Sequence, residues 1–408
     1  MKNILISSIT AISIASGAAY KLPEQSLKGT ALSAANVASC DGADCAYYNP
    51  ANISFLDANS QFIEAGLTFV HLPKISFKGT YTILTNPPVN ATAKTLTENV
   101  AIPYLHYVSK AYGNFRYALS VTVPAGLTKR WNTPVQKLTA QEFALKTVML
   151  NPSVAYKINS KFSFAVGANI VYSEGKVYSD GTDVGLPLKR EMKGNSTDYG
   201  YNLAASLHLD NGLNLAATYR SKIKLSEKGK ANLYFGGVGK KYDANVNIYI
   251  PATLTLAVSK DIKQWTLEFV YERTLWSSYK TLDFNYNKPL PTILSSFNTK
   301  IPKHWKDTNT FRIGTQYRYN DKLTLMAGYS YDQSPVPKEY ISYELPDSIA
   351  HVFSAGFKYK QNQHLTWGAS ILYDYKTKRK IYNNTNPIKG EFTKGGALLI
   401  TSGFEYKF

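Results

Sequence analysis

Apolar and polar side chains alternate in runs of about ten residues from residue 61 to the end of the chain. Residues 265–272 alternate Trp, Leu, Phe and Tyr with Thr, Glu, Val and Glu, and the same period recurs in residues 311–319 and 365–376. A period of two places one set of side chains on each face of a β-strand. The polar face carries Arg and Glu beside Gly and Ser, which suits a wet barrel interior better than the core of a soluble sandwich.

Short and long connections alternate between the predicted strands. Tight turns are predicted near residues 112–114, 159–161, 210–212, 261–262, 320–321 and 361–363, and long connections near residues 83–100, 124–149, 174–198, 225–248, 274–307, 332–350 and 376–396. We interpret residues 61–82 as one strand disturbed at Pro73. The pattern predicts an all-β fold, a membrane-spanning antiparallel β-barrel of about fourteen strands. An even number of strands returns both termini to the periplasm.

Both ends of the chain indicate export to the outer membrane. Lys2 precedes an apolar run and a group of small residues, so residues 1–19 are predicted to be a signal peptide. The apolar run is shorter than the roughly 20 residues of a membrane-spanning helix. Phe404, Tyr406 and Phe408 share one face of the last strand, which resembles the signal that outer-membrane assembly machinery reads. The chain is 13% aromatic, with 31 Tyr, enough for girdles at both membrane interfaces.

Residues 20–60 break the alternating pattern. They are rich in Ala and Gly, poor in charge, and contain both cysteines of the chain, Cys40 and Cys45. The interior of a barrel of about fourteen strands is too wide for its own side chains to fill. We therefore expect residues 20–60 to form a compact plug, or hatch, with short helices inside a barrel of residues 61–408.

Several motifs resemble the FadL family of outer-membrane transporters for long-chain fatty acids and other hydrophobic compounds. The resemblance rests on five stretches: residues 19–26 (AYKLPEQS), residues 29–38, Asn49-Pro50-Ala51, residues 103–107 (PYLHY), and residues 305–308 (WKDT) running to 331–337 (YDQSPVP) and 345–347 (LPD). It spans nearly the whole mature chain.

The resemblance implies the function and its mechanism. An apolar ligand is taken up by the outer loops, binds inside the barrel, and leaves sideways through a gap near an inward kink of the third strand, about residues 115–123. Movement of the mature N-terminus opens the gap. A fatty acid that leaves sideways avoids wetting its chain, which would cost about 0.8 kcal/mol per CH₂. Asn49, Pro50 and Ala51 are expected to hold the hatch geometry or, alternatively, to shape a turn.

The cysteines and the basic residues supply the remaining site predictions. Cys40 and Cys45 are expected to form a structural disulfide in an exported protein; a metal pair, which lacks a nearby His, and a redox site are the alternatives. Lys176 and Lys338 are candidates for binding a carboxylate by position alone, and ordinary surface lysines are the alternative. No cofactor and no metal are expected.

Charge and chemistry limit the other functions. The formal charge is +18, gathered in the predicted outer loops, which suits lipopolysaccharide phosphates and fatty-acid carboxylates; nucleic acid does not suit an exported barrel. The six His show no catalytic grouping, so no enzyme is expected. We predict a monomer in the outer membrane of a Gram-negative bacterium, in contact with lipid, lipopolysaccharide and the assembly machinery. The rival class is a general or anion-preferring diffusion porin for small hydrophilic solutes.

Overall fold

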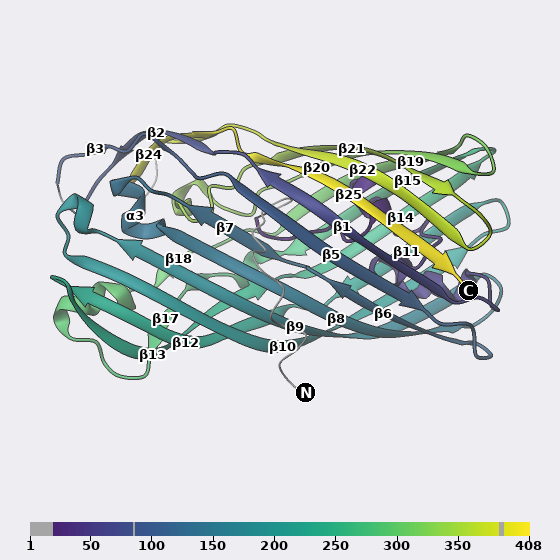
Figure 1. Cartoon of the computed structure of the whole chain (residues 1–408), viewed down its shortest axis with the longest axis horizontal. Helices are drawn as coiled ribbons and strands as arrows, with labels where there is room; N and C mark the ends of the chain where they lie inside the picture. The colour runs from purple at the N-terminus through teal and green to yellow at the C-terminus, as the bar shows by residue number, and fades with distance from the viewer. Residues whose placement is uncertain (1–18, 85, 383–386) are drawn as a thin grey trace.

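The chain folds into a closed antiparallel β-barrel (Figure 1). A computed structural model describes residues 19–84, 86–382 and 387–408, so residues 1–18 of the predicted signal peptide lie outside the described residues. The first wall strand, β1 (Phe62–Leu72), pairs with β5 (Glu98–Val108) on one side and with the last strand, β25 (Gly396–Lys407), on the other. The predicted barrel, closed by its C-terminal strand, is confirmed.

The other wall strands follow in chain order, each antiparallel to its neighbours. They are β6 (Phe115–Thr122), β7 (Gly126–Arg130), β8 (Glu142–Lys157), β9 (Phe162–Asp180), β10 (Leu188–His208), β11 (Leu213–Arg220), β12 (Ile223–Phe235), β13 (Val238–Ile250), β14 (Ala252–Ile262), β15 (Trp265–Leu275), β19 (Thr308–Arg318), β20 (Leu323–Asp332), β21 (Ala350–Lys360) and β22 (Leu365–Lys376). Three successive pairs, β6 with β7, β11 with β12 and β13 with β14, are halves of interrupted strands. The wall therefore has fourteen spanning strands, as predicted.

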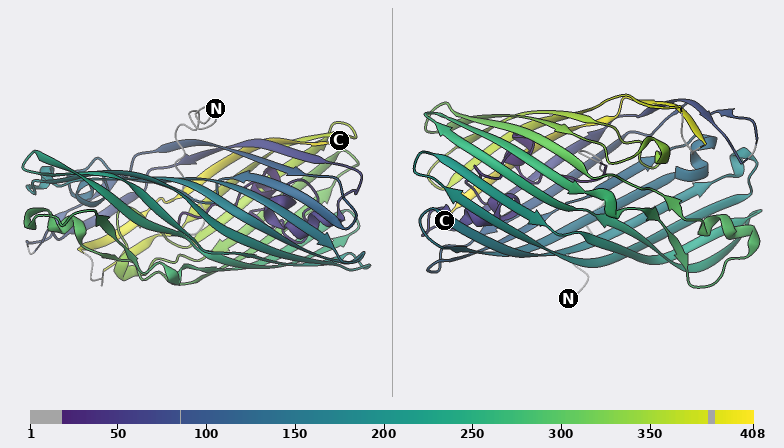
Figure 2. Two further views of the ribbon diagram at one scale, coloured as in Figure 1. Left: turned by 90° about the horizontal axis from the view of Figure 1, so that it is seen from below. Right: turned by 180° about the vertical axis from the view of Figure 1, so that it is seen from behind.

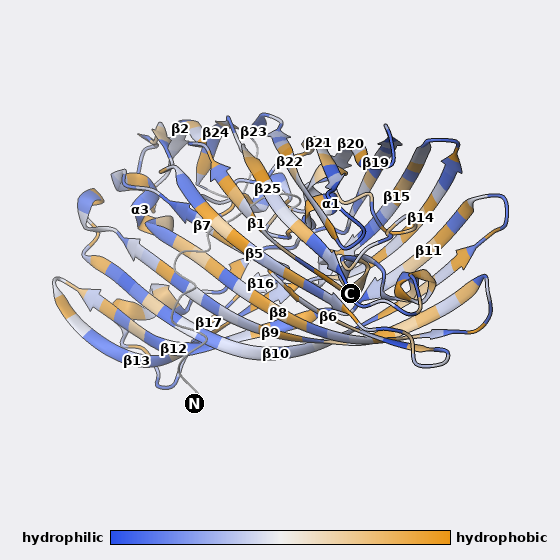
Figure 3. Ribbon diagram, turned by 45° about the vertical axis from the view of Figure 1, so that its right-hand side comes forward, coloured by the Kyte–Doolittle hydropathy of each residue, from blue (hydrophilic) through white to orange (hydrophobic). Residues whose placement is uncertain are grey.

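The alternation in the sequence corresponds to the two faces of the wall (Figure 3). In β15 the side chains of Trp265, Leu267 and Phe269 are 43–44% exposed on the outside of the barrel. Glu268 and Glu272 of the same strand point inward and are buried. Because apolar side chains face outward and carboxylates inward, the outer surface of this wall suits lipid.

Smaller elements gather at the end of the barrel away from the C-terminus (Figures 1 and 2). They are β2 (Ser76–Tyr81), β3 (Val89–Asn90), β4 (Ala93–Lys94), α3 (Pro134–Ala140), η2 (Thr182–Val184), η3 (Trp276–Ser278), β16 (Thr281–Leu282), β17 (Phe284–Tyr286), η4 (Thr292–Asn298), β18 (Ile301–Pro302), η5 (Lys338–Tyr340), β23 (Arg379–Ile381) and β24 (Ile388–Thr393). We call this the long-loop end and the other the short-turn end.

Two predicted connections and one predicted strand differ from the structure. Residues 174–198 and 225–248 belong mostly to strands: β9 and β10 are joined by a short loop, and β12 turns into β13 at Gly236 and Gly237, both with positive φ. The outward side chains of these strand ends are polar, and inward neighbours such as Val177, Met192 and Ala231 are buried, so the apolar outward face that marks a membrane strand is missing there. Residues 61–82 are two strands, since β2 pairs with β24 and not with the wall.

The N-terminal segment lies inside the barrel near the short-turn end (Figure 2). It contains α1 (Leu27–Ala31), α2 (Cys45–Tyr48) and η1 (Pro50–Phe55). Ser26 caps α1, because its hydroxyl oxygen accepts from the Gly29 N–H at 2.8 Å. Among the described residues, no helix is both long and apolar enough to cross a membrane. Below, "arm" denotes residues 19–25 and "hatch" residues 26–55.

Glycines of the wall let the hatch approach closely. A Cβ added at Gly328 in β20 would lie 2.2 Å from the carbonyl carbon of Leu32, and one added at Gly356 in β21 would lie 2.8 Å from the Cβ of Ala31. Real Cβ atoms do not approach backbone this closely, so larger residues at these positions would displace the hatch. The hatch is thus packed directly on the barrel backbone.

Candidate functional site

The third spanning strand is interrupted inside the wall. β6 ends at Thr122 and β7 begins at Gly126, with Pro124 between them. β5 pairs with β6 over only four residue pairs, from Leu105↔Val121 to Val108↔Ala118. Within the described residues, β7 pairs with β8 and has no pairing with β5. The ladder between the second and third strands therefore stops partway along the wall.

The arm covers this interruption from the inside. The Leu22 N–H donates to the Pro124 carbonyl at 3.0 Å, and the Gly126 N–H donates to the Tyr20 carbonyl at 2.9 Å. Lys21 and Ala125 face each other between these bonds as an isolated antiparallel bridge. Unpaired backbone in a membrane wall is unfavourable, since lipid offers no hydrogen bonds. The arm supplies partners that a neighbouring strand would otherwise supply.

Gln25 and His106 fix the base of the arm. The Gln25 side chain donates to the Val123 carbonyl and accepts from the Val123 N–H, both at 2.8 Å. Nε2 of His106 in β5 lies 2.8 Å from the Gln25 carbonyl, which can only accept, so Nε2 carries the proton. Nδ1 then accepts from the Ser120 hydroxyl at 3.1 Å. His106 is a fully buried, hydrogen-bonded residue that links the arm to both strands flanking the interruption.

The tip of the arm sits in an aromatic box. The Tyr20 ring packs edge-on against Trp276, with centroids 5.1 Å apart, and lies 5.7 Å from Trp305. The Tyr20 hydroxyl donates to the Tyr249 carbonyl at 2.6 Å. Tyr20 is 3% exposed. Burial of the ring and the hydrogen bond of the Tyr20 hydroxyl together hold the tip between the hatch and the loops of the long-loop end.

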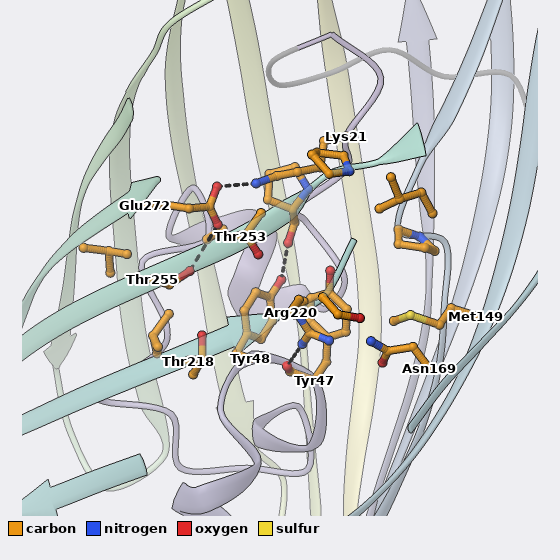
Figure 4. A pocket seen from close by; sticks show the side chains of 18 of the residues that line it. Lys21, Tyr47, Tyr48, Met149, Asn169, Thr218, Arg220, Thr253, Thr255 and Glu272 are labelled. Carbon is orange, nitrogen blue, oxygen red and sulfur yellow. Dashed lines mark hydrogen bonds and ion pairs between the residues drawn. The ribbon is translucent and has the colours of Figure 1, made fainter. Parts of the chain in front are cut away.

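A small cavity lies between the arm, the hatch and the wall (Figure 4). Its volume is about 80 Å³. Lys21 forms an ion pair with Glu272, and Nη2 of Arg312 lies 3.3 Å from the same carboxylate. One carboxylate is thus shared by two cations. The cavity is also lined by Pro23, Ala34, Val37, Tyr47, Tyr48, Pro124, Met149, Asn169, Thr218, Arg220, Ser221, Ile223, Ile250, Pro251, Thr253, Thr255 and Val270.

Arg220 is the uncompensated cation of this cavity. Its guanidinium lies 4.2 Å from the Tyr47 ring centroid, and Nη2 donates to the Tyr47 carbonyl. Nη1 is buried and has no hydrogen-bond partner among the described residues. Within the same residues, no carboxylate lies within ion-pair distance of Arg220. A half-buried guanidinium whose Nη1 is buried and unpartnered suits a carboxylate or another small anion.

The Asn49-Pro50-Ala51 motif lies at the joint between α2 and η1. Nδ2 of Asn49 donates to the Val37 carbonyl and to the Ser206 hydroxyl of the wall, both at 2.8 Å. Its Oδ1 accepts from the Ala51 N–H at 3.2 Å. The motif therefore joins two parts of the hatch to β10, and its predicted part in gating stays a prediction.

Wall carboxylates complete the attachment of the hatch. Glu268 accepts from three consecutive N–H groups, those of residues 37–39, at 2.6–2.9 Å, and Glu405 accepts from the Ala43 N–H at 2.7 Å.

Cys40 and Cys45 are buried thiols with their side chains in hydrogen-bonding contact, and burial raises the pKa of both. Their disulfide stays a prediction.

The two lysines chosen by position lie outside the cavity. Lys176 is on the outer face of β9, with Nζ 3.9 Å from a Glu142 carboxylate oxygen, and Lys338 begins η5 at the long-loop end. Sequence reasoning missed Lys21, Arg220 and Glu272. The one available signal was that the alternation along β11 places Arg220 on the inward face, directly before a break in the strand. Many residues face inward, so this position alone does not identify a ligand-binding residue.

The wall and its internal N-terminal segment define an outer-membrane β-barrel protein. The family described as "Outer membrane protein transport protein (OMPP1/FadL/TodX)" matches residues 8–408, and the chain belongs to this family. It is 26% identical over 415 residues to the long-chain fatty acid transport protein of Escherichia coli K12, covering 88% of this chain and 87% of that one. Outer membrane protein P1 of Haemophilus influenzae is 21% identical over 414 residues, covering 90% and 88%.

Two solved structures share the fold. A Pseudomonas aeruginosa FadL homologue superposes with a TM-score of 0.83 at 19% identity, covering 95% of this chain and 99% of that one. The Ralstonia pickettii toluene transporter TbuX gives a TM-score of 0.70 at 16% identity, covering 94% and 98%. These likenesses support the fourteen-stranded barrel.

Proposed function

We propose that this protein takes up long-chain fatty acids, or hydrophobic small molecules with a similar anionic head, across the outer membrane. The ligand leaves the barrel sideways, between β5 and the interrupted third strand, when the arm moves away. The observation that carries the proposal is the arm itself, since residues 20–25 hydrogen-bond to residues 123–126 where β7 has no pairing with β5. A removable segment, and not a wall strand, closes the barrel there.

The size of the cavity supports a closed state. At about 80 Å³ it would hold two or three waters, at ~30 Å³ each. Pockets that hold drug-sized ligands measure roughly 300–1,000 Å³. A long-chain ligand therefore requires displacement of Tyr20 or Lys21, and the same displacement breaks the hydrogen bonds across the interruption. Ligand binding and opening of the wall are therefore coupled, because both require the same residues of the arm to move.

Arg220 supports an anionic head group. The cavity wall combines apolar side chains with one cation, Arg220, that forms no ion pair with a carboxylate of the described residues. A fatty acid offers a carboxylate for Nη1 and a chain for the apolar wall. The name of the Escherichia coli relative, a long-chain fatty acid transport protein, agrees with this choice.

The orientation in the membrane follows from the connections. We place the short-turn end and both termini in the periplasm, the long-loop end outside, and the host among Gram-negative bacteria. Residues 20–60, which include most of the arm and the whole hatch, act as the plug, and residues 61–408 form the barrel of a monomer. Phe408, whose N–H donates to the Gln61 carbonyl at 3.0 Å, presents the closing strand to the assembly machinery, and lipopolysaccharide surrounds the outer half of the wall.

The porin alternative is disfavoured by the filled lumen. Residues of the hatch such as Ala31, Ala35 and Ile53 are at most 1% exposed, because the wall surrounds them. No catalytic function is proposed.

Uptake measurements test the function. Cells that express the protein should take up radiolabelled oleate faster than cells that lack it, whereas a small hydrophilic sugar should enter both at the same rate. Equal oleate uptake by both strains would contradict the proposal. Faster entry of the sugar alone would favour the porin.

A further inference from the structure

Three lysines stand side by side on the outer face of the wall, toward the long-loop end. Lys193 of β10 is directly opposite Lys176 of β9 and directly opposite Lys230 of β12. All three point away from the lumen, since their chain neighbours Val177, Met192 and Ala231 are buried. We call Lys176, Lys193 and Lys230 the lysine row. Like charges directly opposite one another destabilise a sheet unless an anion compensates them.

Carboxylates on the protein compensate the outer members and not the middle one. Lys230 forms an ion pair with Asp243, and Nζ of Lys176 lies 3.9 Å from Glu142. The Lys193 ammonium lies 5.8 Å from the Tyr178 ring centroid, and no carboxylate of the described chain is within ion-pair distance of it. The middle of the row therefore presents an ammonium group available to an external anion.

The neighbouring rows limit where that anion sits. On the short-turn side, Lys228 is exposed opposite Asn195, and Lys146 is opposite Glu174. On the long-loop side, Glu191 is opposite Tyr178. Positive charge therefore extends toward the membrane at Lys228 and Lys146, beside the carboxylate of Glu174, whereas Glu191 on the other side is ion-paired with Lys189.

The height of the row indicates what the anion is. Tyr172 is the last outward aromatic residue of β9 before Glu174, and Lys176 follows it by four residues, roughly 13 Å along the strand and about 10 Å along the axis of a tilted strand. Tyr199 of β10, 71% exposed, is opposite Ile170, two residues from Tyr172 toward the short-turn end. Aromatic girdles mark the membrane interface, so the row lies in the head-group layer just outside it.

We propose that the lysine row is a binding site for the phosphate groups of the outer-leaflet glycolipid, lipopolysaccharide. Lysine ammonium groups bind phosphate as point charges, and their flexible stems reach down along the wall to a lipid head group. The girdle beneath holds the acyl chains of the same lipid. The site depends on the proposed orientation of the barrel and not on the transported substrate, and it gives Lys176 a role outside the cavity.

Binding of lipid A to the purified mature protein in detergent tests the site, with bound lipid counted by native mass spectrometry. Each lysine beside an anionic lipid surface contributes roughly fivefold to affinity, so K176Q/K193Q/K230Q should weaken binding of bisphosphorylated lipid A by about a hundredfold. The matched control K263Q/K322Q/K360Q removes three lysines near the short turns and should bind within about twofold of wild type. Dephosphorylated lipid A should bind wild type as weakly as the triple variant binds lipid A, and millimolar inorganic phosphate should compete poorly.

Single variants keep the test valid if the triple variant does not fold. Lys193→Gln should weaken binding about fivefold, whereas Lys193→Arg, which keeps the charge, should stay within about twofold. Unchanged affinity in Lys193→Gln and in the triple variant would overturn the proposal. Equal binding of lipid A with and without its phosphates would also overturn it, because the girdle alone would then hold the lipid.

Discussion

The Gln25 side chain pairs with the backbone of Val123 as a neighbouring strand would. It donates to the Val123 carbonyl and accepts from the Val123 N–H, both at 2.8 Å. These bonds lie where the third strand breaks, so a side chain of the arm replaces part of a missing ladder. Lateral opening then requires the loss of a few hydrogen bonds and not the unzipping of two strands.

Replacing Gln25 should loosen the arm. Gln25→Ala removes two buried hydrogen bonds to Val123, worth about 1 kcal/mol each, so the arm should open roughly thirtyfold more often. Hydrogen exchange of the Leu22 amide should accelerate by that factor. Gln363→Ala, in an exposed short turn, is the control and should leave exchange unchanged. Equal protection of Leu22 in Gln25→Ala and wild type would show that these bonds do not hold the arm.

Arg220 should select the anionic head of the ligand. Arg220→Gln removes a charge-assisted contact worth roughly 1.5–3 kcal/mol, so oleate should bind about 10–100-fold more weakly to the purified protein. Oleyl alcohol, with the same chain and no charge, should bind both forms alike. Arg318→Gln, which removes an exposed arginine near a short turn, should change neither. If Arg220→Gln weakens the binding of oleate and of oleyl alcohol equally, Arg220 shapes the cavity and does not distinguish a charged head group from a neutral one.

The arm should dock more weakly as the pH rises through 7. Burial raises the pKa of Glu24 to about 7. The nearby Arg312 lowers this pKa, and the carboxylates of Asp374 and Asp332 raise it further. The docked pKa exceeds the ordinary value of 4.5, so docking is favoured at low pH, where Glu24 is protonated in both states. This stabilisation is progressively lost between about pH 4.5 and just above pH 7, where Glu24 becomes ionised in both states. Exchange of the arm amides, corrected for the intrinsic pH effect, should therefore be faster at pH 8 than at pH 6. Glu24→Gln should remove this difference, and a difference that persists in Glu24→Gln would assign it to another group.

Crowding the wall beneath the hatch should weaken its packing. The Cβ of Gly328→Ala would lie 2.2 Å from the Leu32 carbonyl carbon, and such overpacking costs typically 1–3 kcal/mol. Limited proteolysis should cleave the hatch of Gly328→Ala faster than that of wild type. In Gly175→Ala the new Cβ meets its nearest atoms at 3.5–3.6 Å, so this control should behave as wild type. Equal cleavage of the two variants would mean that the hatch adjusts at no cost.

The predicted Cys40–Cys45 disulfide can be read directly from exported protein. Peptide mapping without reductant should recover residues 40 and 45 in one bridged peptide with no alkylatable thiol. Because the closed loop is short, the bridge should add only about 2 kcal/mol of stability. Alkylation of both thiols in protein taken from an oxidising compartment would exclude the bridge.

The sequence predicted the wall well because its signal is local. Trp265, Leu267 and Phe269 alternate with residues that the lumen buries, and this period is visible without any tertiary information. The site was not predictable in the same way. Gln25 and Val123 are 98 residues apart, and their hydrogen bonds replace a ladder whose absence no local pattern reveals. Every second residue of β11 faces inward, so an inward position alone does not single out Arg220.

The strand ends near the long loops are a second feature that the sequence pattern predicts poorly. The connection predicted at residues 174–198 is wrong, because β9 and β10 continue through most of it with polar outward residues such as Glu174, Lys176 and Asp180. The strands continue there with polar side chains outward and buried ones such as Val177 and Met192 inward, so the apolar outward face that predicts a membrane strand is absent. The same polar outward positions form the lysine row.

Movement of the arm opens the barrel in the proposed mechanism, and a reversible lock tests this movement directly. Lys21 and Ala125 form a bridge without mutual hydrogen bonds, a pair type whose Cα atoms lie about 4.5 Å apart and within the range of a disulfide. In a Cys40→Ala/Cys45→Ala background, Lys21→Cys/Ala125→Cys should lose oleate uptake when oxidised and regain it with reductant. Each single cysteine variant should be insensitive to reductant. Full oleate uptake by the oxidised, demonstrably cross-linked protein would contradict opening by the arm.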